Sequence, residues 1–333
     1  MTTFGGISAR LILMFSLLVA ICLVYLNMGS TELGYARVFN ALLRQGDWTD
    51  NLIVWEMRMP RMVLSLLLGS SLAVSGVLLQ GLSRNDLASP STVGVNAGAG
   101  LGIMIALVMA PVFSLKQPWL MPVAAVGGAL LLTLLVFSLA YRHGTVLPSR
   151  LLLVGIAISY GASAAMLLLS LRMDFVTHNR VVSWMSGSLS SGDWRTLLWL
   201  APSCLCFSLL ALSFARSLNV LALGDEVAAN LGVPVQRKRF LALALATVLT
   251  SSSAAVAGQI GFLGLVAPHL ARRLVGQDHR WLFPAAAISG AALLVLADGL
   301  GRHWFSPNEM PAGVLVGALG SLYFLFLLVR TRG

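Results

Sequence analysis

Long apolar stretches separated by short polar loops run along almost the whole chain. A helix that crosses a bilayer needs about 20 mostly apolar residues. The eighth apolar stretch, IGFLGLVAPHLARRLV, is short and contains Pro268 and His269, so it fits that rule least well. The pattern predicts an all-α integral membrane protein that forms one domain over residues 1–333. Its ten predicted transmembrane helices are 9–28, 61–82, 92–110, 119–140, 151–171, 196–215, 239–257, 260–275, 282–301 and 312–330.

The composition supports this class. Of the 333 residues 58% are hydrophobic and 10% are charged, and the mean hydropathy is +0.87, whereas soluble domains carry about 25% charged residues. The net charge of +10 lies in short loops between apolar stretches, which indicates membrane topology rather than nucleic-acid binding. Cys22, Cys204 and Cys206 fall inside apolar stretches, where we expect small apolar side chains and neither a disulfide nor a metal site.

The loop charges predict the orientation of the chain. Lys and Arg are enriched in cytoplasmic loops. With ten spans and both termini inside, the inner loops hold thirteen basic and four acidic residues, and the outer loops hold nine and eight. This asymmetry favours ten spans over nine, which would place the termini on opposite sides. The first apolar stretch has no clear cleavage site, so we expect it to be retained as a span.

Charged residues border two of the spans on the predicted outer side. Arg58 and Arg61 stand in EMRMPRM directly before the second span, and Asp298 and Arg302 stand in DGLGRHW at the end of the ninth. One interpretation is that the arginines extend to lipid headgroups. Asp298 and Arg302, four residues apart, can also pair along their own helix. The presence of two such outer sites favours a functional role.

Small residues are dense in the second span and the following loop, GSSLAVSGVLLQGLSRNDLASPSTVGVNAGAG. Closely packed membrane helices use such residues, and a channel lining is the alternative. AVSG at 73–76, near the inner end of the second span, resembles AVAG at 255–258, near the outer end of the seventh. Opposite orientation is what a weak inverted repeat would give, as in many transporters.

Catalytic readings find little support. Ser75 and His269 suggest an intramembrane serine protease, whose nucleophile needs a nearby base, but the sequence around Ser75 is only a small-residue helix. A proton-driven carrier needs Asp, Glu or His in mid-membrane, whereas nearly every carboxylate falls at a span end or in a loop. No Gly-rich Walker loop is present, so we expect no nucleotide site and no enzymatic activity in this chain.

The predicted inner loop LALGDEVAANLGVPVQRKR, residues 221–239, has the pattern of two short helices with a sharp turn. Gly224, Asp225 and Glu226 open the first with acids in its first turn, and Gly232 ends it. Pro234 opens the second, which ends in three basic residues. The loop is either a connector with a basic anchor or a docking element on the cytosolic face.

Taken together, these motifs resemble the permease subunits of the iron-siderophore, vitamin B12 and haem class of ABC importers, the type II importers. The resemblance runs along the whole chain in family order. Asp86 departs from it, because the family has proline in RNPLA; this affects the turn after the second span. The matching stretches are RMPR (58–61), SGVLLQGLSRNDLASPSTVGVNAGA (75–99), GDEVAANLGV (224–233), GQIGFLGLVAPHLARRLVGQDHR (258–280), ADGLGR (297–302) and MPAGVLVGALG (310–320).

The resemblance implies a type II importer permease fold with ten spans per subunit and a set of partners. These are a second permease subunit, either another copy or a related chain, two ATPase subunits and a periplasmic or lipid-anchored substrate-binding protein. It also implies site residues. Arg58, Arg61 and Arg302 would dock the binding protein; Gly224, Asp225, Glu226, Ala229, Leu231, Gly232 and Val233 would couple to the ATPase; and Ser149, Arg150 and Leu152 would lie near a cytosolic gate.

The implied function is ATP-driven import of iron(III)-siderophore complexes across the bacterial cytoplasmic (inner) membrane by alternating access. ATP and Mg would bind the partner ATPase, and this chain would bind no cofactor. A cobalamin or haem importer permease of the same family is the alternative. A self-sufficient secondary carrier is the alternative from a different class, and uptake by this chain alone in ATP-free vesicles would support it.

Overall fold

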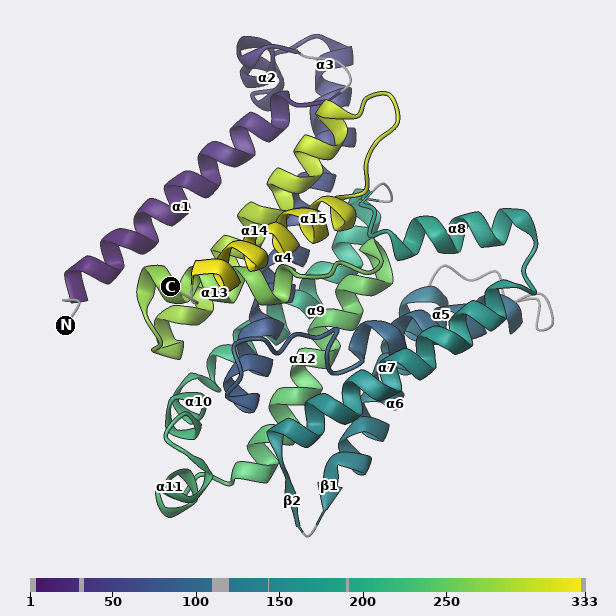
Figure 1. Cartoon of the computed structure of the whole chain (residues 1–333). Coiled ribbons are helices and arrows are strands. Elements are labelled where there is room, and N and C mark those ends of the chain that lie inside the picture. The colour runs from purple at the N-terminus through teal and green to yellow at the C-terminus, as the bar shows by residue number, and fades with distance from the viewer. Residues whose placement is uncertain (1–3, 30–32, 110–119, 143, 190–191, 331–333) are drawn as a thin grey trace.

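The computed structural model describes residues 4–29, 33–109, 120–142, 144–189 and 192–330, and within them the regular secondary structure is helical apart from one short hairpin (Figure 1). The predicted all-α class is confirmed. In chain order the elements are α1 (Phe4–Asn27), α2 (Tyr35–Leu42), α3 (Trp48–Leu52), the π-helix η1 (Ile53–Arg58), α4 (Met59–Ser83), α5 (Val95–Met109), α6 (Leu120–Ala140), β1 (Tyr141–Arg142), β2 (Thr145–Val146), α7 (Pro148–Ser170), α8 (Phe175–Met185), α9 (Trp194–Leu212), α10 (Ala215–Leu221), α11 (Asp225–Asn230), α12 (Val235–Ala257), α13 (Leu263–Val275), α14 (His279–Trp304) and α15 (Ala312–Arg330).

Each of the ten predicted spans coincides with a helix, namely α1, α4, α5, α6, α7, α9, α12, α13, α14 or α15. Within the described ranges, seven helical segments are long and apolar enough to cross a membrane, and α5 and α15 contribute shorter apolar segments. Helix α13 has 13 residues, so at 1.5 Å per residue it extends about 20 Å, less than the hydrocarbon thickness of about 30 Å. Residues 110 and 119, predicted span edges, lie outside the described residues.

Helices α4, α12 and α14 form the centre of the bundle, and most of their residues are buried. Helix α4 packs most extensively against α14. Gly69 and Gly290 lie where these helices meet, and a Cβ atom on either would meet the carbonyl oxygen of the other. Small residues allow such close approach of helix backbones. Close packing of the small-residue second span is therefore confirmed for α4. The channel-lining alternative and the inverted repeat stay predictions.

The outer helices expose large apolar side chains. Leu13 on α1, Leu131 on α6 and Trp199 on α9 are 69%, 71% and 80% exposed. Exposed apolar surface on this scale marks contact with lipid or with another protein. In a bilayer these side chains contact acyl chains or a neighbouring subunit, and the helical backbone satisfies its own hydrogen bonds.

The polar elements lie at two ends of the bundle (Figure 1). Helices α2 and α3 lie at one end, which we call the α2–α3 end, and α10, α11 and the β1–β2 hairpin lie at the other, the α10–α11 end. The apolar pattern did not predict α2, α3, η1, α8, α10 or the hairpin, because they are too short or too polar to resemble a span. Helix α8 begins where Asp174 accepts hydrogen bonds from the amides of Val176 and Thr177. The hydrogen bonds from Thr177 hold the pKa of the Asp174 carboxyl below its ordinary value.

The predicted helical pair at 221–239 requires a correction. Two short helices are present at this end, but they are α10 and α11, joined by a turn that ends at Gly224. The stretch opened by Pro234 is the first turn of the long helix α12 and not a separate helix. The apolar pattern continues beyond Arg239 without a stop signal, which is why this turn runs on into the predicted seventh span.

Candidate functional site

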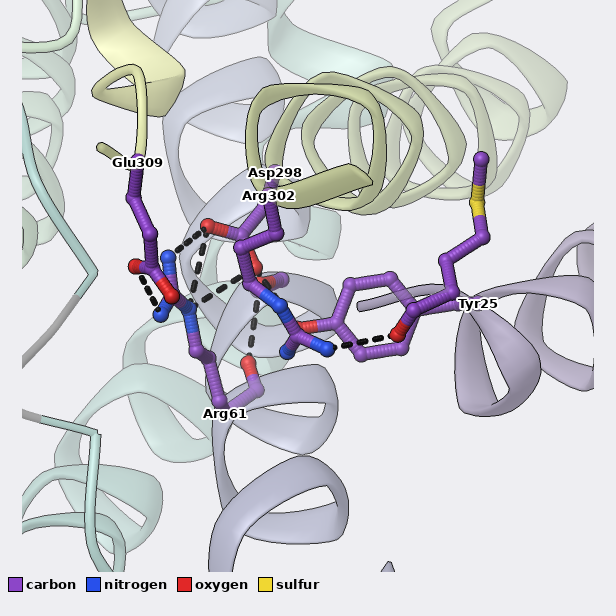
Figure 2. A network of polar contacts seen from close by, with 7 residues as sticks. Tyr25, Arg61, Asp298, Arg302 and Glu309 are labelled. Carbon is purple, nitrogen blue, oxygen red and sulfur yellow. Dashed lines mark hydrogen bonds and ion pairs between the residues drawn. The ribbon is translucent and has the colours of Figure 1, made fainter. Parts of the chain in front are cut away.

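Three arginines, two carboxylates and a tyrosine meet near the α2–α3 end, and we call these six residues the arginine cluster. Figure 2 shows five of its members, with Glu309 and Tyr25 approaching Arg61 and Asp298 from opposite sides. They come from four separate parts of the chain. The cluster consists of Tyr25 at the end of α1, Arg58 in η1, Arg61 in the first turn of α4, Asp298 and Arg302 in the last turns of α14, and Glu309 in the following loop.

Arg61 is the centre of the cluster. Its Nε and Nη2 atoms donate to the Asp298 carboxylate at 2.9 and 2.7 Å, in the bidentate arrangement that suits a planar guanidinium. Its Nη1 atom donates to Glu309 Oε2 at 2.7 Å. Asp298 is 1% exposed and Arg61 is 9% exposed. This ion pair is therefore buried, and Asp298 depends on Arg61 as the charged partner that it binds.

Tyr25 connects the second arginine to the same carboxylate. Its hydroxyl donates to Asp298 Oδ2 at 2.6 Å and accepts from Arg302 Nη1 at 3.1 Å. The Arg302 guanidinium carbon also lies 5.0 Å from the centre of the Tyr25 ring, within cation–π range. Arg302 Nη2 donates to the carbonyl of Met28 at 2.7 Å. The alternative pairing of Asp298 with Arg302 along one helix is not what forms, because Asp298 binds Arg61 on α4.

Arg58 lies beside Arg302 at the end of α1. Its Nη1 atom donates to the carbonyl of Leu26 at 2.6 Å. A Cβ atom at Gly29 would lie only 3.0 Å from Arg58 Nη2 and 3.1 Å from Arg302 Nη2, so glycine leaves the space that both guanidinium groups use. Arg58 and Arg302 are 4% and 7% exposed. The arginines are thus held against helix ends and do not extend toward headgroups.

A second ionic cluster lies at the α10–α11 end, and we call Arg84, Asp225 and Arg239 the Asp225 cluster. Asp225 Oδ1 accepts from Arg84 Nη2 and from Arg239 Nη2, both at 2.8 Å, and Oδ2 accepts from Arg239 Nη1 at 2.8 Å. Arg239 also donates to the Val146 carbonyl at 3.0 Å. One carboxylate thereby joins α11 to the end of α4, the start of α12 and the hairpin.

The other predicted coupling residues lie around α11. Gly224 and Gly232 flank the helix with φ of +114° and +79°, a backbone region that favours glycine. Leu231 is 62% exposed, and Glu226 and Ala229 are exposed, whereas Val233 is half-buried. Asp225 points inward to the two arginines. Helix α11 therefore presents a mixed apolar and acidic surface, while its first residue anchors it to the bundle.

The predicted gate residues Ser149, Arg150 and Leu152 lie in the first turns of α7, directly after the hairpin. Ser149 is exposed, and Arg150 and Leu152 are half-buried. The structure brings them to the same end as the Asp225 cluster through Val146, whose carbonyl binds Arg239. It does not bring them to the arginine cluster.

Asp86, the residue that departs from the family pattern, has a wider role than a local turn. Its carboxylate lies 3.1 Å from Arg272 Nη1, so it forms an ion pair with α13. The Asp86 side chain is 62% exposed and that of Arg272 is 13% exposed. The aspartate therefore ties the loop after α4 to the short helix α13, a contact that proline could not make.

The described residues contain no group of three or more His, Cys, Asp or Glu side chains that could hold a metal ion. The structure also does not place His269 against Ser75, as the serine-protease interpretation requires. Ser75 Oγ lies 2.9 Å from the Ala246 carbonyl and 2.7 Å from Thr250 Oγ1. His269 instead lies edge-on to Tyr323, with ring centres 5.9 Å apart.

A helical bundle with apolar outer helices, a buried charged cluster at one end and short polar helices at the other defines a multi-pass membrane protein of the transport class. The chain belongs to the FecCD transport family, whose model matches residues 17–330. This confirms the resemblance drawn from the motifs.

Known proteins that are similar over almost the full length carry permease names. The chain is 37% identical to the iron(3+)-hydroxamate import system permease protein FhuG of Bacillus subtilis (strain 168), over 96% of each chain. It is 40% identical to the hemin transport system permease protein HmuU of Yersinia pestis, over 98% of each. A solved structure described as an inward-facing metal-chelate type ABC transporter matches with a TM-score of 0.84 and 29% identity, covering 97% of this chain and 99% of that one. The chain is therefore an ABC permease, a transport component.

Proposed function

We propose that this chain is the permease of an ATP-driven importer that receives an iron(III)-siderophore from a binding protein at the α2–α3 end. The observation that carries the proposal is the arginine cluster, in which three guanidinium groups and two carboxylates lie together. Arg61 pairs with both carboxylates, and Arg58 and Arg302 donate to neutral acceptors. The excess positive charge, held at fixed positions, suits a partner that presents acidic side chains. Charge complementarity of this kind orients a partner and speeds its encounter more than it adds affinity.

The opposite end would receive the ATPase. Helix α11 is short and carries Asp225 and Glu226 in its first turn. It also presents exposed apolar side chains, on it and beside it, namely Leu223, Val227 and Leu231. Its link to α4 and α12 through the Asp225 cluster supports a coupling role, because a displacement of α11 would be passed to two central helices. Ser149, Arg150 and Leu152, near this linkage, would form the cytosolic gate.

The mechanism would be alternating access. ATP and Mg bind the partner ATPase dimer, its closure moves α11, and the pathway between two permease subunits, copies or related chains, opens toward the binding protein. A ligand shifts such an equilibrium only by its differential affinity for the two states. Most carboxylates lie at helix ends or in loops, so a bulky chelate would meet few charges that could hold it along the path.

Iron(III)-siderophore is the substrate that the similar proteins support best, since siderophore and ferric-chelate permease names outnumber the hemin and cobalamin names among them. Haem or cobalamin remains the alternative within the family. With both termini inside, the α10–α11 end would face the cytosol of a bacterial cell and the arginine cluster would face the periplasmic side of its inner membrane.

The test is reconstituted uptake. We expect vesicles that contain this permease, its ATPase and its binding protein to accumulate a ferric hydroxamate only when ATP and Mg are on the ATPase side. Hemin and cobalamin supplied in the same way would identify the alternatives. Uptake by the permease alone without ATP would contradict the proposal and favour a secondary carrier.

A further inference from the structure

The two carboxylates that bind Arg61 differ in access. Asp298 is 1% exposed and binds one edge of the guanidinium, through Nε and Nη2. The Glu309 side chain is 47% exposed, and its Oε2 atom takes the remaining nitrogen, Nη1, at 2.7 Å. Glu309 belongs to the loop between α14 and α15, whereas Asp298 lies within α14. One carboxylate is therefore part of the buried core, and the other reaches Arg61 from a half-exposed loop, on the side away from Tyr25 (Figure 2).

An incoming acidic side chain that approaches Arg61 would compete with Glu309. The Nε–Nη2 edge of Arg61 is turned to Asp298 in the interior, so Nη1, on the Glu309 side, is the nitrogen that an external carboxylate would approach. A carboxylate from a binding protein offers the same chemistry as Glu309. The two cannot accept the same hydrogen bond in the same geometry, and like charges brought together repel each other.

We infer that Glu309 is an internal substitute for the acidic side chain of the binding protein. It compensates Arg61 while the permease is unoccupied, and it lowers docking affinity because it must be displaced. This inference rests on the proposed function and adds a residue that sets the strength of docking. Glu309 thereby favours release of the binding protein after delivery, since its carboxylate returns to Arg61 as the partner leaves.

A purely structural role for Glu309 predicts a different result. If the carboxylate only anchors the loop before α15, removing it disorders the docking surface and weakens binding. A general charge effect predicts a third result, in which removal of any nearby acid tightens binding by the same amount. Glu56 is the matched control, because it is an exposed acid in η1 at the same end of the molecule.

The experiment measures the affinity of the binding protein for the purified full transporter that carries Glu309→Gln, Glu309→Asp or Glu56→Gln. An ion pair with one exposed partner is worth up to about 1 kcal/mol, so we expect Glu309→Gln to tighten binding about three- to fivefold. Glu309→Asp keeps the net charge but shortens the reach to Arg61, and it should tighten binding by a smaller factor. Glu56→Gln should change affinity less than about twofold.

Unchanged or weaker binding by both Glu309 variants would overturn the inference, as would an equal gain in Glu56→Gln. A different result would show that the proposed docking site itself is wrong. In that case Arg302→Gln would leave the affinity for the binding protein unchanged. Weaker binding in Arg302→Gln together with no gain in Glu309→Gln would retain docking at the arginine cluster and reject the role of Glu309 alone.

Discussion

The ion pair between Arg61 and Asp298 is the residue-scale feature on which the arginine cluster depends. Both side chains are almost fully buried, and a buried charge without a partner is costly. The hydrogen bond from Tyr25 adds a third contact to the same carboxylate and brings the end of α1 to α14. Asp298 is thus the acceptor that holds α1, α4 and α14 together at this end.

Replacement of Asp298 by asparagine is expected to destabilise the protein. Removing one partner of a buried ion pair costs up to about 3–5 kcal/mol, and in this variant Arg61 keeps only the half-exposed Glu309 as a charged partner. We expect a clear fall in the thermal unfolding midpoint of the purified protein in detergent. Glu56→Gln, an exposed acid at the same end, should shift the midpoint little. Equal midpoints for wild type and Asp298→Asn would show that Asp298 does not hold the helices together.

Sequence motifs identified three of the six residues of the arginine cluster as a site. Arg58, Arg61 and Arg302 stand in recognisable stretches at predicted span ends, and charge at a span end is visible in sequence. Tyr25 and Glu309 were not predicted, because their partners lie 273 and 248 residues away along the chain. The residues next to Tyr25 and Glu309 in the sequence give no sign of contacts with such distant partners. The alternative in which Asp298 pairs with Arg302 along α14 is wrong for the same reason, since Asp298 binds Arg61, 237 residues away along the chain.

At the scale of elements, helix α11 and its flanking glycines are the feature most closely connected to coupling. Gly232 has φ of +79°, and a Cβ atom added to it would have no heavy atom within 4 Å, so a side chain there would meet backbone strain but no clash. Non-glycine residues in this region cost about 1–3 kcal/mol, and β-branched ones are especially disfavoured. The turn after α11 therefore requires glycine for its backbone.

We expect Gly232→Val to leave the protein inserted and uncoupled. The strained turn would shift α11 relative to the Asp225 cluster, and substrate-stimulated ATPase activity and uptake of the reconstituted transporter should both fall several-fold. Gly161→Val is the matched control, because it adds the same side chain in open space on α7, where φ is not positive. Wild-type ATPase stimulation and uptake in Gly232→Val would exclude the coupling role.

The sequence predicted the long elements well and the short ones poorly. Ten apolar stretches correspond to ten helices, since a bilayer requires length and apolarity that are easily counted. Helices α2, α8 and α10 have 8, 11 and 7 residues, and nothing in a span rule detects them. The division of 221–239 was wrong because Pro234 can open a long helix as readily as a short one.

At the scale of the whole molecule, the two ionic clusters at opposite ends give the bundle a direction. The exposed apolar surface of α1, α6 and α9 lies between them, as expected for a membrane-embedded belt. The loop charges predict which end is cytosolic, because thirteen basic residues fall in loops assigned to the inside. We therefore expect the α10–α11 end to lie on that side.

Cysteine labelling tests this orientation. We expect a cysteine at position 236, in the first turn of α12, to react with an impermeant thiol reagent only from the cytosolic side. One at position 47, before α3, should react only from outside. Both belong in a background in which Cys22, Cys204 and Cys206 are replaced. Labelling of the two positions from the same side would contradict the ten-span topology with both termini inside.

The measurement that tests the central claim most directly is the affinity of the binding protein for purified, folded transporter with Arg302→Gln, at low and raised salt. Arg302 donates to neutral acceptors, the Tyr25 hydroxyl and the Met28 carbonyl. Its replacement therefore does not leave a bonded carboxylate without its partner. We expect binding about tenfold weaker or more and a wild-type affinity that falls with salt, since salt screens the attraction between the permease and an approaching acidic partner beyond about 8–10 Å. The control Arg44→Gln, an exposed arginine at the same end, should lose much less. Wild-type affinity in Arg302→Gln, without salt dependence, would contradict docking at the arginine cluster.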